Sequence, residues 1–131
     1  MKHPNAEEVL QNILARDPRY KAEAYAFVRS CLDYTIRRLD KPRHVSGQEL
    51  LGGMREFALS EFGPMTQTVL NGWGIQRTED IGEIVFNMVE TGLLGKTEKD
   101  SRADFANGYG FDEAFRKPFR PAAPKVGKQT N

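Results

Sequence analysis

The chain of 131 residues is long enough for one domain with a sizeable core, and its hydrophobic (39%) and charged (28%) fractions are those of a globular protein rather than a disordered one. No apolar run approaches the roughly 18 residues that a membrane-spanning helix needs, and no apolar signal segment follows the polar N-terminus, so we expect a cytoplasmic protein with no membrane partner. A single cysteine, Cys31, excludes an intramolecular disulfide and a cysteine metal cluster. Its place on the apolar face of a predicted helix indicates a buried, inert thiol.

The net charge of +1 is unevenly distributed along the chain. Residues 116–131 contain five basic and no acidic residues, which leaves 14 basic and 18 acidic residues, a net charge of −4, in residues 1–115. Pro118, Pro121 and Pro124 fall in the same basic stretch, a composition typical of a disordered segment. We therefore divide the chain into a helical domain, residues 1–116, and a disordered, basic, proline-containing tail, residues 117–131.

Two helices are expected before residue 42. Asn5 is a suitable N-cap for a helix over residues 6–16, whose apolar residues form one narrow stripe. Asp17 followed by Pro18 has the form of an N-cap and a first helical residue, so the second helix is predicted to begin there. It should be the longest element, about 22 residues, and end before Pro42, because the residue before a proline disfavours helical geometry.

The clearest helix-start signal in the chain follows residue 44. Ser46 and Glu49 have the spacing of a capping box, and Val45 and Leu50 have that of a hydrophobic staple. A third helix is therefore predicted to begin directly after Ser46.

Two consecutive glycines, Gly52 and Gly53, interrupt the apolar pattern of this third helix. Each glycine in a helix interior costs on the order of 1 kcal/mol relative to alanine, so a pair of them calls for a reason. We expect a neighbouring helix to approach closely at Gly53. The alternative is a ligand that packs against bare backbone.

Gly63 and Pro64 predict a break, followed by a short helix with Met65, Leu70 and Trp73 facing inward, Trp73 as a core anchor. Thr78 is the predicted N-cap of the next helix. The apolar residues of that helix recur every three or four positions and are Ile81, Ile84, Val85, Met88 and Val89.

The periodicity weakens after Gly92. Residues 97–105 could form one more short helix or a loose β-ribbon, and Tyr109, Phe111 and Phe115 are spaced to press an irregular segment onto the helices. We expect a mainly α, compact, single-domain bundle of five to six helices. The order of elements also resembles a winged helix with a minimal β-ribbon, which we keep as a finer alternative.

In a winged helix, residues 78–90 would form the helix that enters the DNA groove. This stretch contains Glu79, Asp80, Glu83 and Glu90, and residues 78–95 contain no lysine or arginine. DNA binding requires cations that neutralise phosphates, so duplex DNA is not expected as a partner. The acidic face is either an ordinary solvated face or one suited to a basic protein.

Basic residues gather at the end of the second predicted helix and in the tail, and together they form the candidate interaction surface. Cations at a helix C-terminus also complement the helix dipole, which explains the first group without a ligand. If the two groups met in the fold, they would form a phosphate-binding patch for RNA. The candidate residues are Arg37, Arg38, Lys41, Arg43, His44, Arg116, Lys117, Arg120, Lys125 and Lys128.

We recognise no motif for catalysis, metal binding or cofactor binding. The two histidines, His3 and His44, lack a metal-binding spacing, and the acidic residues of 98–104 lack the spacing and central glycine of a calcium loop. The glycines match neither a phosphate loop nor a dinucleotide fingerprint. The sequence therefore predicts no catalytic residue, cofactor or metal ligand, and it favours a protein that is not an enzyme.

Seven segments of the chain together look familiar. They are 44–51 (HVSGQELL), 62–65 (FGPM), 73–75 (WGI), 78–87 (TEDIGEIVFN), 95–100 (GKTEKD), 104–105 (DF) and 111–115 (FDEAF). With these segments the chain resembles a family of small bacterial cytoplasmic proteins, over about residues 10–115 and without the tail. The resemblance implies a compact cytoplasmic domain of bacterial origin and brings no established activity, cofactor or catalytic residue.

The leading functional hypothesis is a non-enzymatic binding module that acts through contact with another protein. That protein could be part of a ribonucleoprotein, which the basic tail would help the module to find. The first alternative is a nucleic-acid-binding regulator with a winged-helix-like core, for which binding should weaken steeply with salt. The second is an enzyme or small-ligand protein with an unrecognised site, for which a pocket with convergent polar groups would be the sign.

Overall fold

The computed structural model describes residues 5–95 and 101–120, and these are mainly helical. No strand occurs in the described residues. The mainly α class is therefore confirmed, whereas the β-ribbon is not observed, and residues 96–100, in the middle of its expected position, lie outside the described chain. The α-helices are α1 Ala6–Arg16, α2 Ala22–Arg37, α3 Gly47–Phe62, α4 Thr66–Gly72 and α5 Thr78–Glu90. Shorter helical turns are η1 Gly63–Met65, η2 Arg102–Phe105, η3 Asp112–Arg116 and η4 Lys117–Phe119.

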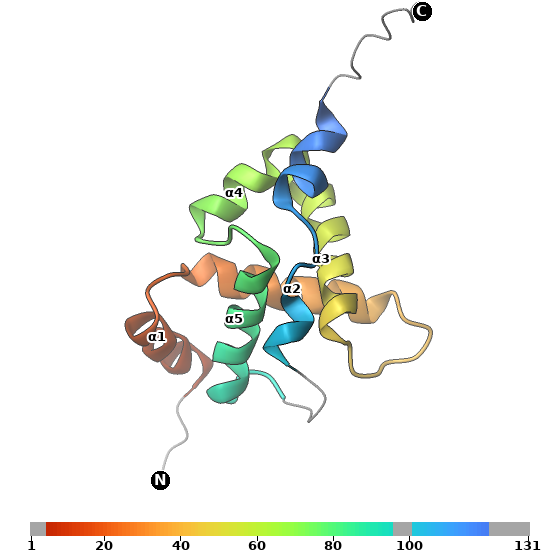
Figure 1. Cartoon of the computed structure of the whole chain (residues 1–131). Helices are drawn as coiled ribbons and strands as arrows, with labels where there is room; N and C mark the ends of the chain where they lie inside the picture. Colours follow the sequence, from red (N-terminus) through yellow and green to blue (C-terminus); the bar gives the residue numbers. More distant parts are fainter. Residues whose placement is uncertain (1–4, 96–100, 121–131) are drawn as a thin grey trace, which may run out of the picture.

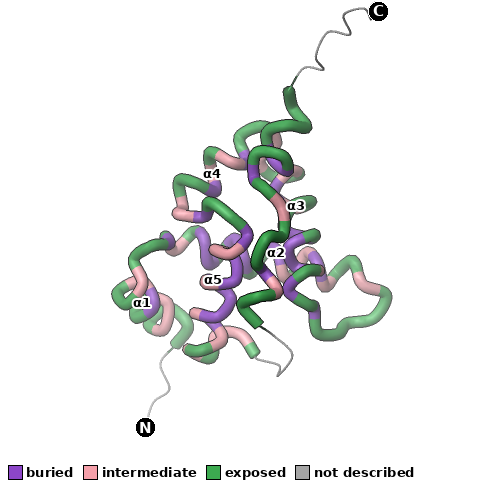
Figure 2. The backbone as a smooth tube through the Cα atoms, viewed as in Figure 1, coloured by how far each residue is buried: buried purple, intermediate pink, exposed green. Residues whose placement is uncertain are grey.

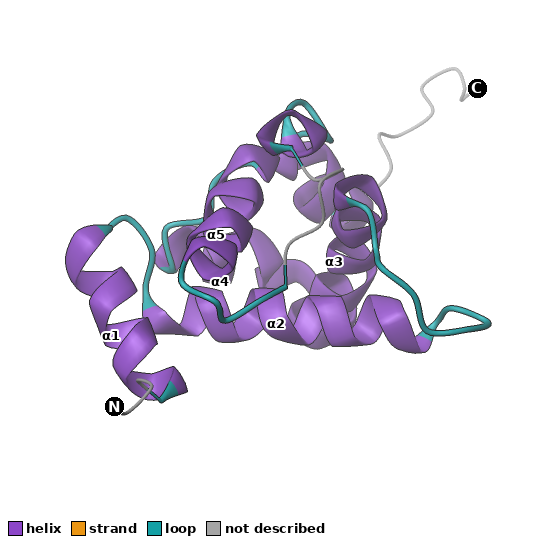
Figure 3. Cartoon of the chain, turned by 90° about the horizontal axis from the view of Figure 1, so that it is seen from below, coloured by secondary structure: helices purple, strands orange, loops and turns teal. Residues whose placement is uncertain are grey.

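The helix α2 lies across the middle of the molecule, with α3 and α5 packed against it and α1 at one side (Figure 1). After α5 the chain places η2 against α3 and α5, then reaches η3, which packs against α3, α4 and η1. Buried residues concentrate where α2, α3 and α5 meet (Figure 2). In the view from below, α1 lies at one end of α2 and α3 lies toward its other end (Figure 3). No described helix is long and apolar enough to traverse a lipid bilayer.

The predicted caps of α1 and α3 are confirmed. The Asn5 side chain accepts a hydrogen bond from the Glu8 backbone N–H (2.8 Å), and the Ser46 hydroxyl accepts one from the Glu49 N–H (3.1 Å). The Glu49 carboxylate accepts from the Ser46 N–H in return (3.0 Å). Both helices therefore begin where local side chains satisfy their free backbone donors.

The predicted start of α2 is wrong, because the N-cap is Lys21 and not Asp17, and the first helical residue is Ala22 and not Pro18. Asp17 instead ends α1, and its carboxylate accepts hydrogen bonds from the Arg19 backbone N–H (3.2 Å) and guanidinium (2.7 and 2.8 Å). The Lys21 N–H donates to the Trp73 carbonyl oxygen (3.1 Å) in a distant loop. These contacts hold residues 17–21 in a turn, and α2 has 16 residues, the same length as α3.

The close approach expected at Gly53 is confirmed. A Cβ built on Gly53 would overlap the Thr35 hydroxyl oxygen, and it would lie 3.0 Å from the Thr35 Cβ. The backbones of α2 and α3 therefore meet at a position where only glycine fits. Gly52, by contrast, has no atom within 4 Å of such a Cβ.

Three expectations near α4 and α5 need correction. Leu70 is fully buried as predicted, but Met65 is 55% exposed and Trp73 is half-buried. The N-cap of α5 is Arg77, one residue before the predicted Thr78. The Asp80 carboxylate accepts hydrogen bonds from the Gln76 and Arg77 N–H groups (2.8 and 3.2 Å) and so takes the capping role predicted for Thr78. The Thr78 hydroxyl oxygen instead accepts from the Gly108 N–H (3.1 Å).

The apolar face of α5 and the aromatic residues of the C-terminal segment lie in the core as predicted. Ile81, Ile84, Val85 and Met88 are buried with Val89 packed beside them, and Phe111 and Phe115 are buried with Tyr109 against them. The turn η4 and Arg120 follow directly, and the remainder of the expected tail, residues 121–131, lies outside the described residues.

Candidate functional site

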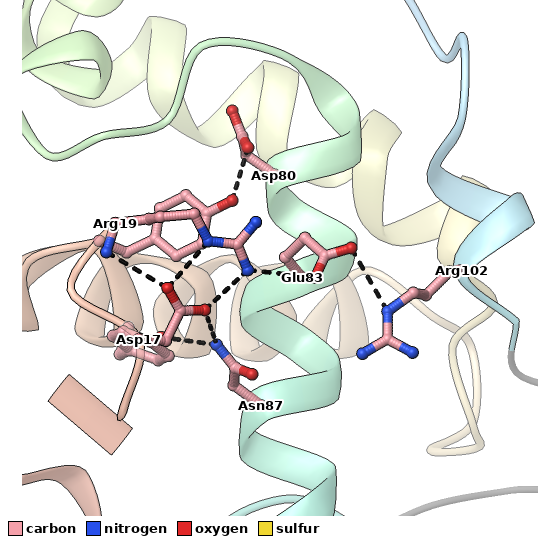
Figure 4. A network of polar contacts seen from close by, with 8 residues as sticks. Asp17, Arg19, Asp80, Glu83, Asn87 and Arg102 are labelled. Carbon is pink, nitrogen blue, oxygen red and sulfur yellow. Dashed lines mark hydrogen bonds and ion pairs between the residues drawn. The ribbon is translucent and has the colours of Figure 1, made fainter. Parts of the chain in front are cut away.

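A polar network joins the turn after α1 to the outer side of α5 (Figure 4). The Asn87 amide donates to the Asp17 carboxylate (2.9 Å) and to the Tyr25 hydroxyl oxygen (3.0 Å). Arg19 also reaches Glu83 (3.3 Å), and the other oxygen of Glu83 pairs with Arg102 of η2 (3.3 Å). Contacts from the turn and from η2 thus converge on one helix face.

Hydrogen bonding to Arg19 holds the pKa of Asp17 well below its usual range, with Asn87 adding to the effect against the opposing influence of burial. Burial raises the pKa of Tyr20, and its hydroxyl donates to Asp80 (2.5 Å), which raises it further. These groups are therefore fixed in single protonation states near neutral pH. Such a network binds separate segments of the fold together.

The same network changes the interpretation of the acidic face of α5. Glu83 is paired with two arginines, Asp80 caps its own helix, and Glu79 accepts a hydrogen bond from the Asn107 N–H (3.2 Å). Of the four carboxylates in residues 78–90, those of Glu79, Asp80 and Glu83 therefore form hydrogen bonds or ion pairs within the fold.

In the predicted basic group at the end of α2, Arg38 and Arg43 form ion pairs within the fold. Arg43 forms a bidentate pair with Glu49 (2.7 and 3.0 Å), and Arg38 lies 3.4 Å from Glu56. The pairing lowers the pKa of Glu49 to about 2, chiefly through its hydrogen bond with Arg43. Arg37 and Lys41 are exposed and have no ion pair in the described chain, and His44 is exposed at the edge of an apolar cavity.

The basic residues of the C-terminal segment lie elsewhere. Arg120 pairs with Asp112 (2.9 Å), whereas Arg116 and Lys117 are exposed without an ion pair among residues 5–95 and 101–120. Residues 38–46 lead into the start of α3, while η3 packs against η1 and α4, which follow its end. The two basic groups therefore lie at opposite ends of α3 (Figure 1) and form no single patch, and Lys125 and Lys128 lie outside the described residues.

The structure brings together a row of aromatic rings that the sequence analysis did not identify as a surface. Tyr34 contacts Phe57 (5.3 Å between ring centroids), Phe57 contacts Phe27 (6.0 Å), and Phe27 contacts Phe62 and Trp73 (5.8 and 5.6 Å). Phe27 is buried beneath the row, and the other four rings are half-buried. We call these five residues the aromatic face, which spans α2, α3 and the end of α4.

Both ends of the aromatic face carry polar groups. The Tyr34 hydroxyl donates to Glu56 (3.2 Å) and accepts from Arg38 (3.0 Å), whose guanidinium also lies over the Tyr34 ring at 5.3 Å. At the other end, the Trp73 indole N–H has no hydrogen-bond partner within the described residues, and it is not among their buried unpaired atoms. The face therefore combines apolar rings with an available donor. Tyr34 follows Phe27 by seven residues, so the sequence places these two rings on one side of α2, but it does not show the rings of α3 and α4 beside them.

Three further features of the described residues bear on binding or catalysis: the cysteine thiol, an apolar cavity and the potential metal ligands. Cys31 is 1% exposed and burial raises its pKa, which confirms a buried thiol. The cavity beside His44, between α2, α3 and α5, has a volume of about 110 Å³ and a mainly apolar lining. No group of three or more potential metal-ligating side chains occurs among the described residues.

Comparisons of the chain with protein-family models, with curated proteins and with solved structures found no match.

Proposed function

We propose that this chain is a non-enzymatic protein-binding module and that it contacts its partner through the aromatic face. The observation that carries the proposal is the arrangement of four half-buried rings in two contacting pairs, Tyr34 with Phe57 and Phe62 with Trp73. The buried ring of Phe27 contacts both pairs and joins them across α2, α3 and the end of α4. Aromatic residues are enriched in protein interfaces, where they bury large areas at a small cost in conformational entropy. Mutual ring contacts already restrict these side chains, which lowers that cost further.

The chemistry of the face favours an apolar or amphipathic segment of a partner protein. Apolar side chains would cover the rings, and a carbonyl or carboxylate oxygen would accept from the Trp73 indole N–H. The Arg38–Glu56 ion pair at the Tyr34 end provides a polar rim for further hydrogen bonds. An amphipathic helix presents side chains with suitable spacing for such a row.

The nucleic-acid alternative receives less support. Arg38, Arg43 and Arg120 are ion-paired, and the two basic groups lie at opposite ends of α3, so they do not form one phosphate-binding surface. The winged-helix interpretation lacks an observed strand in residues 5–95 and 101–120. We retain RNA binding through the C-terminal basic residues as an outcome of the test below.

We also propose membership of the bacterial family that the sequence resembles. The quoted motifs correspond to structural requirements of this fold: 44–51 contains the cap of α3, and 78–87 contains most of α5. A C′ glycine at 74 adopts φ of +97°, and a Cβ there would overlap the Arg19 carbonyl oxygen. These segments support the fold, so the resemblance is consistent with a shared scaffold.

Affinity capture from the native host tests the function. The full-length protein, a truncated form of residues 1–116, the variants Tyr34→Ser and Trp73→Ser, and the control Phe119→Ser would each be immobilised, with and without nuclease treatment. Phe119 is 46% exposed and makes no ring contact with the aromatic face, so its substitution removes similar apolar area elsewhere. A partner that survives nuclease and Phe119→Ser, and is lost with Tyr34→Ser and Trp73→Ser, supports the proposal. A partner lost on nuclease treatment and on truncation to residues 1–116 would replace it with nucleic-acid binding.

A further inference from the structure

A groove lies between the exposed side of α3 and the segment that follows η2. Its volume is about 350 Å³, which is within the range of small-ligand sites. Gln48, Gly52 and Arg55 of α3 form one wall, and Asn107 and Tyr109 belong to the other. The groove is distinct from the aromatic face, which uses other residues of α3.

The wall formed by residues 106–109 is held in place by several hydrogen bonds. The Asn107 N–H donates to Glu79 (3.2 Å), and the Tyr109 hydroxyl donates to the Leu51 carbonyl oxygen (2.6 Å). Asn107 has φ of +52° and is the one non-glycine residue with positive φ in the described chain. Left-handed backbone held by surrounding contacts is common at binding sites, and it gives this wall a fixed shape.

The floor of the groove is bare helical backbone at Gly52. Gly53 is required by Thr35, but no described atom lies within 4 Å of a Cβ placed on Gly52. The fold therefore contains a glycine in a helix interior that its own packing does not require. A ligand that lies against the helix would provide the missing reason.

The side chains around this floor are rich in unused hydrogen-bond donors. Arg55 lies over the Tyr109 ring (5.8 Å), and no carboxylate pairs with it among residues 5–95 and 101–120. The side-chain amides of Gln48 and Asn107 likewise have no hydrogen-bond partner in the described chain. The carboxylate in the groove, Asp104, already accepts from the Ser101 N–H (3.1 Å). The donors available to a ligand are thus one guanidinium and two amides, and Asp104 is the one carboxylate among the groove residues, so an anion would bind against Arg55.

We propose that this groove binds a small oxyanionic ligand, a carboxylate or a phosphate, with Arg55 as the charged contact, Asn107 and Gln48 as amide donors, and Gly52 as the open floor. Guanidinium groups bind both anions through paired hydrogen bonds. The stacked position of Arg55 on Tyr109 restricts the guanidinium before the ligand arrives. The proposal does not depend on the function proposed for the aromatic face.

A titration of isotope-labelled full-length protein, followed by NMR, tests this site. Inorganic phosphate and citrate would be added separately at constant ionic strength, with chloride as the reference for non-specific screening. We expect saturable shifts of the Gly52, Asn107 and Gly108 amide signals and of the Arg55 side-chain N–H. Comparison of the two titrations distinguishes a phosphate site from a carboxylate site.

Four variants test whether the signal shifts come from this groove. Arg55→Gln should weaken binding about tenfold or more, because a hydrogen bond to a charged group is lost. Gly52→Leu should block the groove, whereas Arg37→Gln, which removes an exposed cation on α2, should change nothing. Gly52→Ala should raise the melting temperature and still weaken binding, which a purely structural glycine would not do. Shifts no larger than those with chloride, or equal losses with Arg55→Gln and Arg37→Gln, would overturn the proposal.

Discussion

The adjacent glycines of α3 show how strongly a single position depends on its neighbours. Gly53 faces Thr35 across the contact between α2 and α3, and the Thr35 hydroxyl also donates to the Cys31 carbonyl oxygen (2.8 Å). Rotation of Thr35 would break that bond in a buried site. Gly52 is exposed, and no described atom lies within 4 Å of a Cβ built on it.

The two alanine substitutions should therefore change stability in opposite directions. Gly53→Ala should lower the free energy of unfolding by about 1–3 kcal/mol, because overpacking forces the helices apart. Gly52→Ala should raise it by up to about 1 kcal/mol, because alanine has the higher helix propensity. Urea denaturation of both variants measures this. A similar loss for both would show that Gly52 is packed against the fold after all.

Asp17 should make folding stability depend on pH. Its folded pKa is depressed below the usual 3.8, so its stabilising contribution is complete above that value and is lost as the pH falls through the folded pKa. Asp17→Asn should lower the free energy of unfolding by about 1–2 kcal/mol at neutral pH, from the loss of charge-assisted hydrogen bonds with Arg19. The variant should also lose less stability than the wild type on acidification below pH 4. Parallel acid limbs for the two proteins in thermal melts would contradict this assignment.

At the scale of the element, α3 begins at Ser46 because two reciprocal hydrogen bonds satisfy its first donors. Ser46→Ala should lower the free energy of unfolding by about 1 kcal/mol. Ser60→Ala, at an exposed position in the same helix, should be neutral or slightly stabilising. Denaturation midpoints of the two variants provide the comparison. Equal midpoints would mean that the cap contributes nothing to stability.

Sequence patterns identified elements whose signals are local. The capping residues of α1 and α3 and the apolar face of α5 depend on partners three or four residues away, so spacing was sufficient. The start of α2 was misplaced because distant groups decide it: Asn87 and the Trp73 carbonyl hold residues 17–21 in a turn. Propensity at Asp17 and Pro18 was thus overridden by tertiary contacts.

The two candidate binding surfaces could not be predicted from the sequence, because each depends on contacts between residues far apart in the chain. The aromatic face combines residues of α2, α3 and α4, and the groove places Arg55 beside Tyr109, 54 positions along the chain. Spacing within one helix cannot show which helices become neighbours. The Gly52–Gly53 pair was the local sign of the groove, because only Gly53 has a packing reason.

At the scale of the whole molecule, the C-terminal segment contributes to the core up to η3, and the described residues 117–120 contribute little to it. Phe115 is fully buried, whereas Phe119 is 46% exposed and the Arg120–Asp112 pair has both side chains more than half exposed. Exposed ion pairs contribute about 0–1 kcal/mol. Stability should therefore depend on Phe115 and not on the residues after 116.

Truncation tests this boundary. A protein ending at residue 116 should keep nearly the melting temperature of the full chain, whereas Phe115→Ala should lower the free energy of unfolding by about 3–5 kcal/mol through the cavity it creates. Calorimetry of both proteins provides the measurement. A large fall in melting temperature for the truncated chain would mean that residues 117–131 pack against the domain.

The most direct test of the central claim is photocrosslinking in the native host. A photoreactive phenylalanine analogue at position 34, in the aromatic face, would be compared with the same analogue at position 119. Our account predicts a crosslink from position 34 to one defined protein, abolished by Trp73→Ser and retained after nuclease treatment, with none to that protein from position 119. Crosslinks from position 119 alone, or crosslinks from position 34 that disappear with nuclease, would contradict the protein-binding function.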